Sequence, residues 1–72
     1  MENIGERVRH IRKLHNLNQK SSSNAINISQ GHLSEIEKNI CKPSAETLIS
    51  LSQIFNPNLN WLLLGEGEQF KE

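Results

Sequence analysis

The sequence predicts an all-α fold of five short helices. Apolar residues recur at steps of three and four, which is the spacing of helices with one buried face. An Asn or Ser precedes each of five such segments, where its side chain can accept a hydrogen bond from a free backbone N–H group. The chain has 72 residues, enough for one small domain and too few for two. Strand-like alternation and internal repeats are absent from the sequence.

Residues 4–15 form the first predicted helix. Its apolar residues at helical spacing are Ile4, Val8, Ile11 and Leu14. Asn3 is placed to cap this helix, and Glu6 follows three residues later, as in a capping box. Asn16 then suits the left-handed backbone conformation that ends many helices.

Residues 19–26 form a second and less favourable helix. Asn18 is placed to cap it, and Asn27 supplies a tight turn after it. Three serines and an asparagine inside the segment offer the backbone competing hydrogen bonds. Each costs about a few tenths of a kcal/mol relative to alanine. We therefore expect packing by neighbouring helices to hold this segment.

A third helix is predicted over residues 30–38, and a fourth begins after Pro43. Ser29 caps the third helix, which turns Leu33 and Ile36 toward the core. Ser44 caps the fourth helix. Its apolar residues recur at steps of three and are Leu48, Leu51 and Ile54.

The fifth predicted helix covers residues 59–64 and is strongly apolar. Asn58 caps it, and Gly65 ends it. Residues 1–67 are therefore expected to form the domain, and residues 68–72 an acidic C-terminal tail.

Charge and composition restrict the classes of function. Eight Lys/Arg residues balance eight Asp/Glu residues, but residues 1–42 hold seven of the basic residues against four glutamates. This polarity can direct the N-terminal part of the chain toward a polyanion, although a charged half is more often a solvated face. The single cysteine forms no internal disulfide, and no apolar stretch is long enough to span a membrane. We therefore expect a cytoplasmic protein without a membrane partner.

Two short helices joined by a tight turn, the second polar on one face, are the pattern of a helix-turn-helix. Further motifs accompany it: Leu17-Asn18-Gln19, Ile26-Asn27-Ile28-Ser29-Gln30, Leu33-Ser34-Glu35-Ile36-Glu37-Lys38-Asn39, Lys42-Pro43-Ser44 and Thr47-Leu48. With these motifs the sequence resembles the lambda-repressor and Cro-like (XRE-type) helix-turn-helix family, with the helix-turn-helix at about residues 18–38. Residues 59–67 resemble the fifth helix of phage-repressor-type members.

The resemblance implies a transcriptional repressor that binds an inverted-repeat operator in double-stranded DNA as a homodimer. It places the base contacts at Gln30, Gly31, His32 and Glu35, with Ser34 alongside. The amide of Gln30 suits adenine, and the carboxylate of Glu35 can accept from cytosine. Gly31 either lets the backbone approach the bases or is merely tolerated at a helix start. His32 either donates to DNA or is an exposed neutral histidine.

The implied phosphate contacts are Asn18, Gln19, Lys38, Lys42 and Arg12. Asn18 and Gln19 open a helix, where free N–H groups attract phosphate. Arg12 and Glu37 lie beside the apolar stripes of their helices, and the family often pairs these two positions. We expect a partly buried ion pair that also presents an Arg12 donor near a phosphate.

The fifth helix is more apolar than a short surface helix requires, which favours a dimer interface at Trp61 and Leu64. Three pairs of residues depart from the family pattern: Ser22 and Ser23 for Leu and Ala, Asn27 and Asn39 for Gly, and Ile40 and Cys41 for basic residues. We expect the first pair to thin the core. The second should preserve turn geometry, and the third should weaken nonspecific DNA affinity.

Catalysis, metal binding and cofactor binding find little support in the sequence. It has no Asp and no glycine-rich phosphate loop, and the lone Cys41 lacks a zinc-like spacing. We therefore expect no enzyme, no metal, no cofactor and no small-molecule substrate. Two alternatives stay open: a protein-interaction module on the same scaffold, and an antitoxin that represses its own operon. Cys41 is expected to be an adventitious thiol, with a redox sensor as the alternative.

Overall fold

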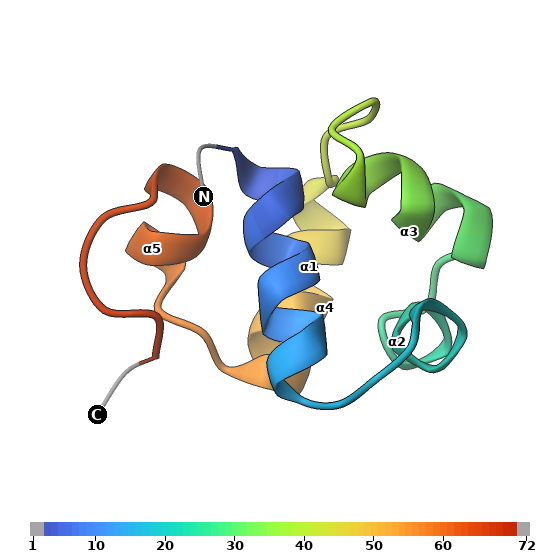
Figure 1. The fold of residues 1–72 in the computed structure, drawn as a ribbon, viewed down its shortest axis with the longest axis horizontal. Coiled ribbons are helices and arrows are strands. Elements are labelled where there is room, and N and C mark those ends of the chain that lie inside the picture. Colours follow the sequence, from blue (N-terminus) through green and yellow to red (C-terminus); the bar gives the residue numbers. More distant parts are fainter. Residues whose placement is uncertain (1–2, 71–72) are drawn as a thin grey trace.

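This computed structural model describes residues 3–70, which contain five helices joined by short turns and loops. They are α1 (Ile4–Leu14), α2 (Gln19–Ala25), α3 (Gln30–Glu37), α4 (Ala45–Phe55) and α5 (Leu59–Leu64). Figure 1 shows α1 through the centre with α4 behind it, α5 on one side, and α2 and α3 on the other. The predicted all-α class is confirmed. None of these helices is long and apolar enough to cross a membrane.

Side-chain caps fix where each helix begins. Each cap oxygen accepts from a backbone N–H of the first turn: Asn3 from Glu6, Asn18 from Ser21, Ser29 from His32, Ser44 from Thr47 and Asn58 from Asn60. Each of these bonds satisfies a donor that the helix itself leaves without a partner. The five helix starts predicted from these residues are therefore confirmed.

Asparagines in the left-handed conformation end four of the helical segments. Asn16, Asn27, Asn39 and Asn56 have φ values of 57°, 64°, 63° and 48°. Asn tolerates this region better than other residues with a Cβ, because its short polar side chain can bond locally. The turns at Asn27 and Asn39 thus keep their geometry without glycine, as predicted.

The core draws on all five helical segments. Its buried apolar residues are Val8, Ile11, Ile26, Leu33, Ile36, Leu51, Phe55, Trp61 and Leu62. Leu33 and Ile36 are almost fully buried, which confirms the inward face predicted for α3. Leu14 and Ile54 continue the apolar spacing of their helices but are 48% and 43% exposed. Each lies in the last turn of its helix, where the core does not cover it.

Trp61 is a core residue and does not face a partner, contrary to the sequence prediction. It is 7% exposed, and its neighbour Leu62 is 1% exposed. The physical reason is that α5 packs against α1 and buries these two side chains in the contact. Leu59, Leu63 and Leu64 remain exposed instead, at 37%, 42% and 65%.

Part of the segment predicted as an acidic tail, residues 69–70, pairs with the turn before α5. The backbone N–H of Asn58 donates to the carbonyl of Gln69 at 2.8 Å, and Pro57 pairs with Phe70 in an isolated β-bridge. Phe70 packs against the core. Its aromatic ring was the available sign that this segment does not stay in solvent. Residues 71–72 of the predicted tail lie outside the described residues.

The serines of α2 leave an unsatisfied polar atom in the core. Ser22 and Ser23 are both 1% exposed. The hydroxyl of Ser23 donates to the carbonyl of Lys20 at 2.9 Å, whereas the hydroxyl of Ser22 has no hydrogen-bond partner within the described residues. A buried hydroxyl without a partner loses its hydration and gains nothing in return.

Ser22→Ala should therefore raise the free energy of unfolding by about 1–3 kcal/mol, because it removes the unsatisfied hydroxyl. Urea denaturation followed by circular dichroism measures the change. Ser21→Ala is the matched control, since Ser21 is exposed in the same helix and reports helix propensity alone, worth about a few tenths of a kcal/mol. A Ser22→Ala variant no more stable than this control would contradict the prediction.

Candidate nucleic-acid interface

The outer face of α3 carries the five residues predicted to read bases. Gln30, Gly31 and Glu35 are exposed, and His32 and Ser34 are half-buried. The opposite face is anchored in the core, and the cap at the helix start fixes its first turn. The structure therefore exposes three of the five residues and leaves the other two partly accessible on the same helix.

The start of α2 lies close to the same surface. Asn18 is exposed, and its side-chain oxygen accepts from the backbone N–H of Ser21 at 2.7 Å. The side-chain amide of Gln19 donates to Oε1 of Glu37 at 3.1 Å. The side chain of Gln19 is thus held toward α3. The backbone N–H groups in the first turn of α2 can donate hydrogen bonds to an anion.

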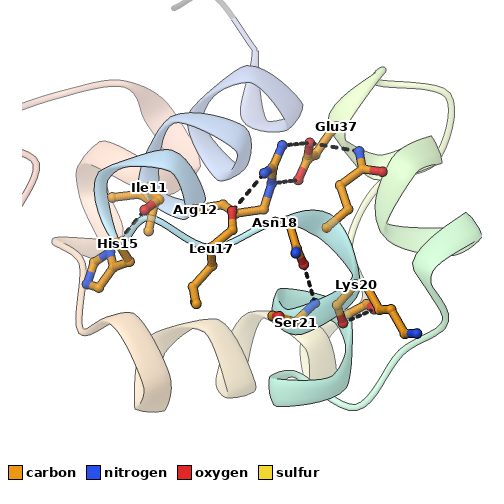
Figure 2. Close-up of polar contacts among 10 residues, drawn as sticks. Ile11, Arg12, His15, Leu17, Asn18, Lys20, Ser21 and Glu37 are labelled. Carbon is orange, nitrogen blue, oxygen red and sulfur yellow. Dashed lines mark hydrogen bonds and ion pairs between the residues drawn. The ribbon is translucent and has the colours of Figure 1, made fainter.

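Arg12 and Glu37 join α1 to α3 through a bidentate ion pair (Figure 2). Nε and Nη2 of Arg12 donate to Oε2 and Oε1 of Glu37 at 2.7 and 2.9 Å. The two residues are 9% and 7% exposed. The sequence-predicted pair is therefore present, and its geometry is the planar fork that Arg and carboxylates favour.

The guanidinium of Arg12 also bonds to the turn before α2, and its predicted contact with a phosphate stays a prediction. Nη1 of Arg12 donates to the carbonyl of Leu17 at 2.9 Å, in the turn before α2 (Figure 2). Three of the five N–H groups of the guanidinium thus bond within the domain. The geometry gives Arg12 the role of fixing the start of α2 relative to α3.

Lys38 and Lys42 flank the C-terminal end of α3. Both are exposed, and Lys38 is the C-cap residue of the helix. Within residues 3–70 the structure shows no ion pair to either lysine. Both ammonium groups are therefore available to a polyanion beside the α3 surface.

Comparison with known proteins identifies this arrangement. A sequence model of the helix-turn-helix domain family matches residues 5–68. The chain belongs to this family. It is 32% identical over 66 residues to the HTH-type transcriptional regulator DicA of Escherichia coli (strain K12), covering 92% of this chain and 49% of that protein. It is 30% identical over 69 residues to the HTH-type transcriptional regulator ImmR of Bacillus subtilis (strain 168), covering 96% and 54%. The helix-turn-helix chain thus spans about half the length of both relatives.

A solved structure shares the fold. The helix-turn-helix chain resembles the crystal structure of the P22 c2 repressor protein in complex with synthetic operator 9T in the presence of Tl⁺. The TM-score is 0.83 and the identity is 27%, over 92% of this chain and all of that chain. The family resemblance inferred from the sequence motifs is confirmed.

Arg7 is a buried residue of this helix-turn-helix domain that the sequence analysis missed. It is 5% exposed, and it donates from Nε to the carbonyl of Leu62 at 2.7 Å and from Nη2 to that of Leu63 at 3.2 Å. Both carbonyls lie at the C-terminal end of α5, where a cation is favourable. The available signal was spacing, since Arg7 lies three residues after Ile4 and four before Ile11, on the apolar stripe of α1.

A cluster of possible metal ligands lies at α3 and the loop after it, and was not predicted from the sequence. The ligand atoms of His32, Glu35 and Cys41 all lie within 4.8 Å of one another. Cys41 gave no metal-like spacing in the sequence, because it is in the loop after α3. The left-handed turn at Asn39 returns that loop toward the helix and brings the thiol beside it.

Proposed function

We propose that this helix-turn-helix domain binds DNA sequence-specifically, as the DNA-reading part of a transcription regulator. The observation that carries the proposal is α3, which is anchored by Leu33 and Ile36 and presents Gln30 outward from its first turn. An exposed amide at this point suits bidentate pairing with adenine in the major groove. The fold likeness to a repressor in complex with operator DNA supports this reading. The role is binding, not catalysis, and a DNA-bound protein belongs in the cytoplasm.

The grip on the DNA backbone is proposed to come from both ends of the helix-turn-helix. In this proposal, Asn18 and the backbone N–H groups in the first turn of α2 contact phosphates of one DNA strand. Lys38 and Lys42 contact phosphates beside α3. Their exposure supports this assignment. Phosphate contacts set register and orientation, whereas the residues on α3 supply sequence preference.

We propose further that two copies contact each other through α4 and α5 and together bind an inverted repeat. Leu48, Ile49, Leu59 and Leu63 line an apolar groove between these helices. Leu64, the next residue along α5, is also exposed. This surface takes the place that the sequence analysis had given to Trp61. Two recognition helices related by a twofold axis would read half-sites about 34 Å apart, one turn of DNA.

Selection of binding sites from a random duplex pool at two salt concentrations tests the function directly. We expect an enriched inverted repeat and an affinity that falls steeply with salt. An enriched single half-site would contradict the dimer but keep the DNA-reading role. Absence of enrichment together with salt-insensitive, near-zero retention would overturn the proposal and favour a protein-interaction module.

Gln30→Ala and Lys38→Ala should separate base reading from phosphate contact. Gln30→Ala should weaken binding to the selected site by about 1–3 kcal/mol and leave binding to a scrambled duplex nearly unchanged. Lys38→Ala should weaken both duplexes alike and reduce the slope of log K against log salt by about one. Fluorescence anisotropy on the two duplexes measures both effects. Equal loss on both duplexes for Gln30→Ala would remove Gln30 from the base contacts.

A further inference from the structure

The cluster of His32, Glu35 and Cys41 has the donors of a metal site. It offers an imidazole nitrogen, a carboxylate oxygen and a thiol sulfur, and these atoms lie within 4.8 Å of one another. We infer that the three residues bind Zn²⁺, and that the bound ion withdraws His32 and Glu35 from reading DNA. The second half of this inference rests on the proposed function. The first half does not.

The backbone holds Cys41 next to α3. The N–H of Asn39 donates to the carbonyl of Ile36 at 3.0 Å, and the N–H of Ile40 donates to the carbonyl of Glu35 at 2.9 Å. These two bonds, with Asn39 left-handed, form a Schellman motif that ends the helix. The N–H of Cys41 also donates to the carbonyl of Glu35, at 3.3 Å. The thiol is therefore positioned by hydrogen bonds to the same residue whose carboxylate completes the cluster.

The spacing on α3 brings the other two ligands together. His32 and Glu35 are three residues apart in one helix, so their side chains share a face. His32 and Cys41 are half-buried, and Cys41 packs against the core, which limits the motion of both side chains. Glu35 is exposed, and its carboxylate has no hydrogen bond or ion pair within residues 3–70.

The donor set favours Zn²⁺ over Mg²⁺ and Ca²⁺. Zn²⁺ binds thiolate, imidazole and carboxylate at about 2.0–2.3 Å in tetrahedral geometry, whereas Mg²⁺ and Ca²⁺ prefer oxygen ligands alone. Three protein ligands leave the fourth position for water. Cys41 binds as the thiolate, so its proton passes to the buffer when the ion enters.

The position of the cluster connects metal binding to DNA reading. His32 and Glu35 are two of the five residues proposed to contact bases, and a group that coordinates Zn²⁺ no longer offers the same atoms to a base edge. Binding of the ion and binding of the selected DNA site should therefore oppose each other, and the opposition is reciprocal. Nonspecific binding through the lysines is left intact.

Titration of the reduced chain with Co²⁺, without DNA, tests the site itself. We expect a thiolate-to-cobalt charge-transfer band that saturates at equimolar metal and disappears when Zn²⁺ is added. Cys41→Ser should abolish the band, and His32→Gln and Glu35→Gln should weaken binding. His15→Gln and Glu46→Gln are the matched controls, since both residues lie outside the cluster. Absence of the band in the unmodified chain, or full affinity in the cluster variants, would overturn the site.

Affinity for the selected duplex and a scrambled duplex, with Zn²⁺ and with a chelator, tests the coupling. We expect Zn²⁺ to lower the preference for the selected duplex roughly tenfold in the unmodified chain, the effect of losing one good base contact. Cys41→Ser should show no such change, and its affinity in chelator should match that of the unmodified chain. An unchanged preference in the metal-loaded chain would overturn the coupling. Lack of any preference in chelator would instead refute the proposed function, and the cobalt titration would still decide the metal site.

Discussion

Gly5→Ala should lower the free energy of unfolding by about 2 kcal/mol or more, because α1 and α3 meet there without space for a side chain. A Cβ on Gly5 would overlap the backbone carbonyl oxygen of Ile36 and lie 3.0 Å from the carbonyl oxygen of Glu37. Both obstacles are backbone atoms, so no rotamer change relieves them. Alanine ordinarily stabilises a helix by up to about 1 kcal/mol relative to glycine, and the overlap outweighs that gain.

Gly31→Ala is the matched control, since a Cβ at Gly31 meets nothing within 4 Å. Its stability should equal or exceed that of the unmodified chain. Urea denaturation of both variants gives the comparison. Equal stability of the two would show that α1 and α3 can move apart to accept the Cβ without lowering the free energy of unfolding. The control also decides the role of Gly31, because a stable Gly31→Ala variant that binds DNA weakly would show that DNA approaches the backbone there.

Helix starts and turns could be predicted because their determinants are local. A cap at Asn18 or Ser29 acts within one turn, and an asparagine such as Asn27 takes the left-handed conformation through its own side chain. The inward face of α3 followed from spacing alone, since its two anchors lie three residues apart. The residues expected to read DNA on this helix came instead from the family resemblance, and their contacts with DNA stay a prediction.

Features that depend on contacts between helices could not be predicted in this way. α5 has six residues, fewer than two turns, so periodicity did not decide whether Trp61 or Leu63 faces α1. The crowding at Gly5 depends on how closely α3 crosses α1. The cluster with Cys41 depends on where a left-handed turn returns the chain, although the turn itself was predicted. In each case the decisive neighbour is distant in the sequence or lies past a turn.

Arg12→Met should lower the free energy of unfolding by about 3–5 kcal/mol, because it leaves the carboxylate of Glu37 buried without its counterion. The side chain of Glu37 is 3% exposed, so water does not replace the lost donors. The loss should extend to α2, since Arg12 also holds the carbonyl of Leu17, and Glu37 holds the side chain of Gln19. Amide hydrogen exchange should therefore speed up in the first turn of α2 before the domain unfolds globally.

A double-mutant cycle shows whether the pair acts as a unit. Arg12→Met combined with Glu37→Met leaves no buried charge at this pair. The double variant should therefore lose about 1–3 kcal/mol less free energy of unfolding than the two single variants lose in sum. Arg9→Met is the matched control, because Arg9 is exposed on the same helix and its loss should change stability little. Additive losses would mean that the two residues act independently. A recovered double variant with a still-mobile α2 would show that the pair serves mainly to position the helix-turn-helix, and that its net contribution to stability is small.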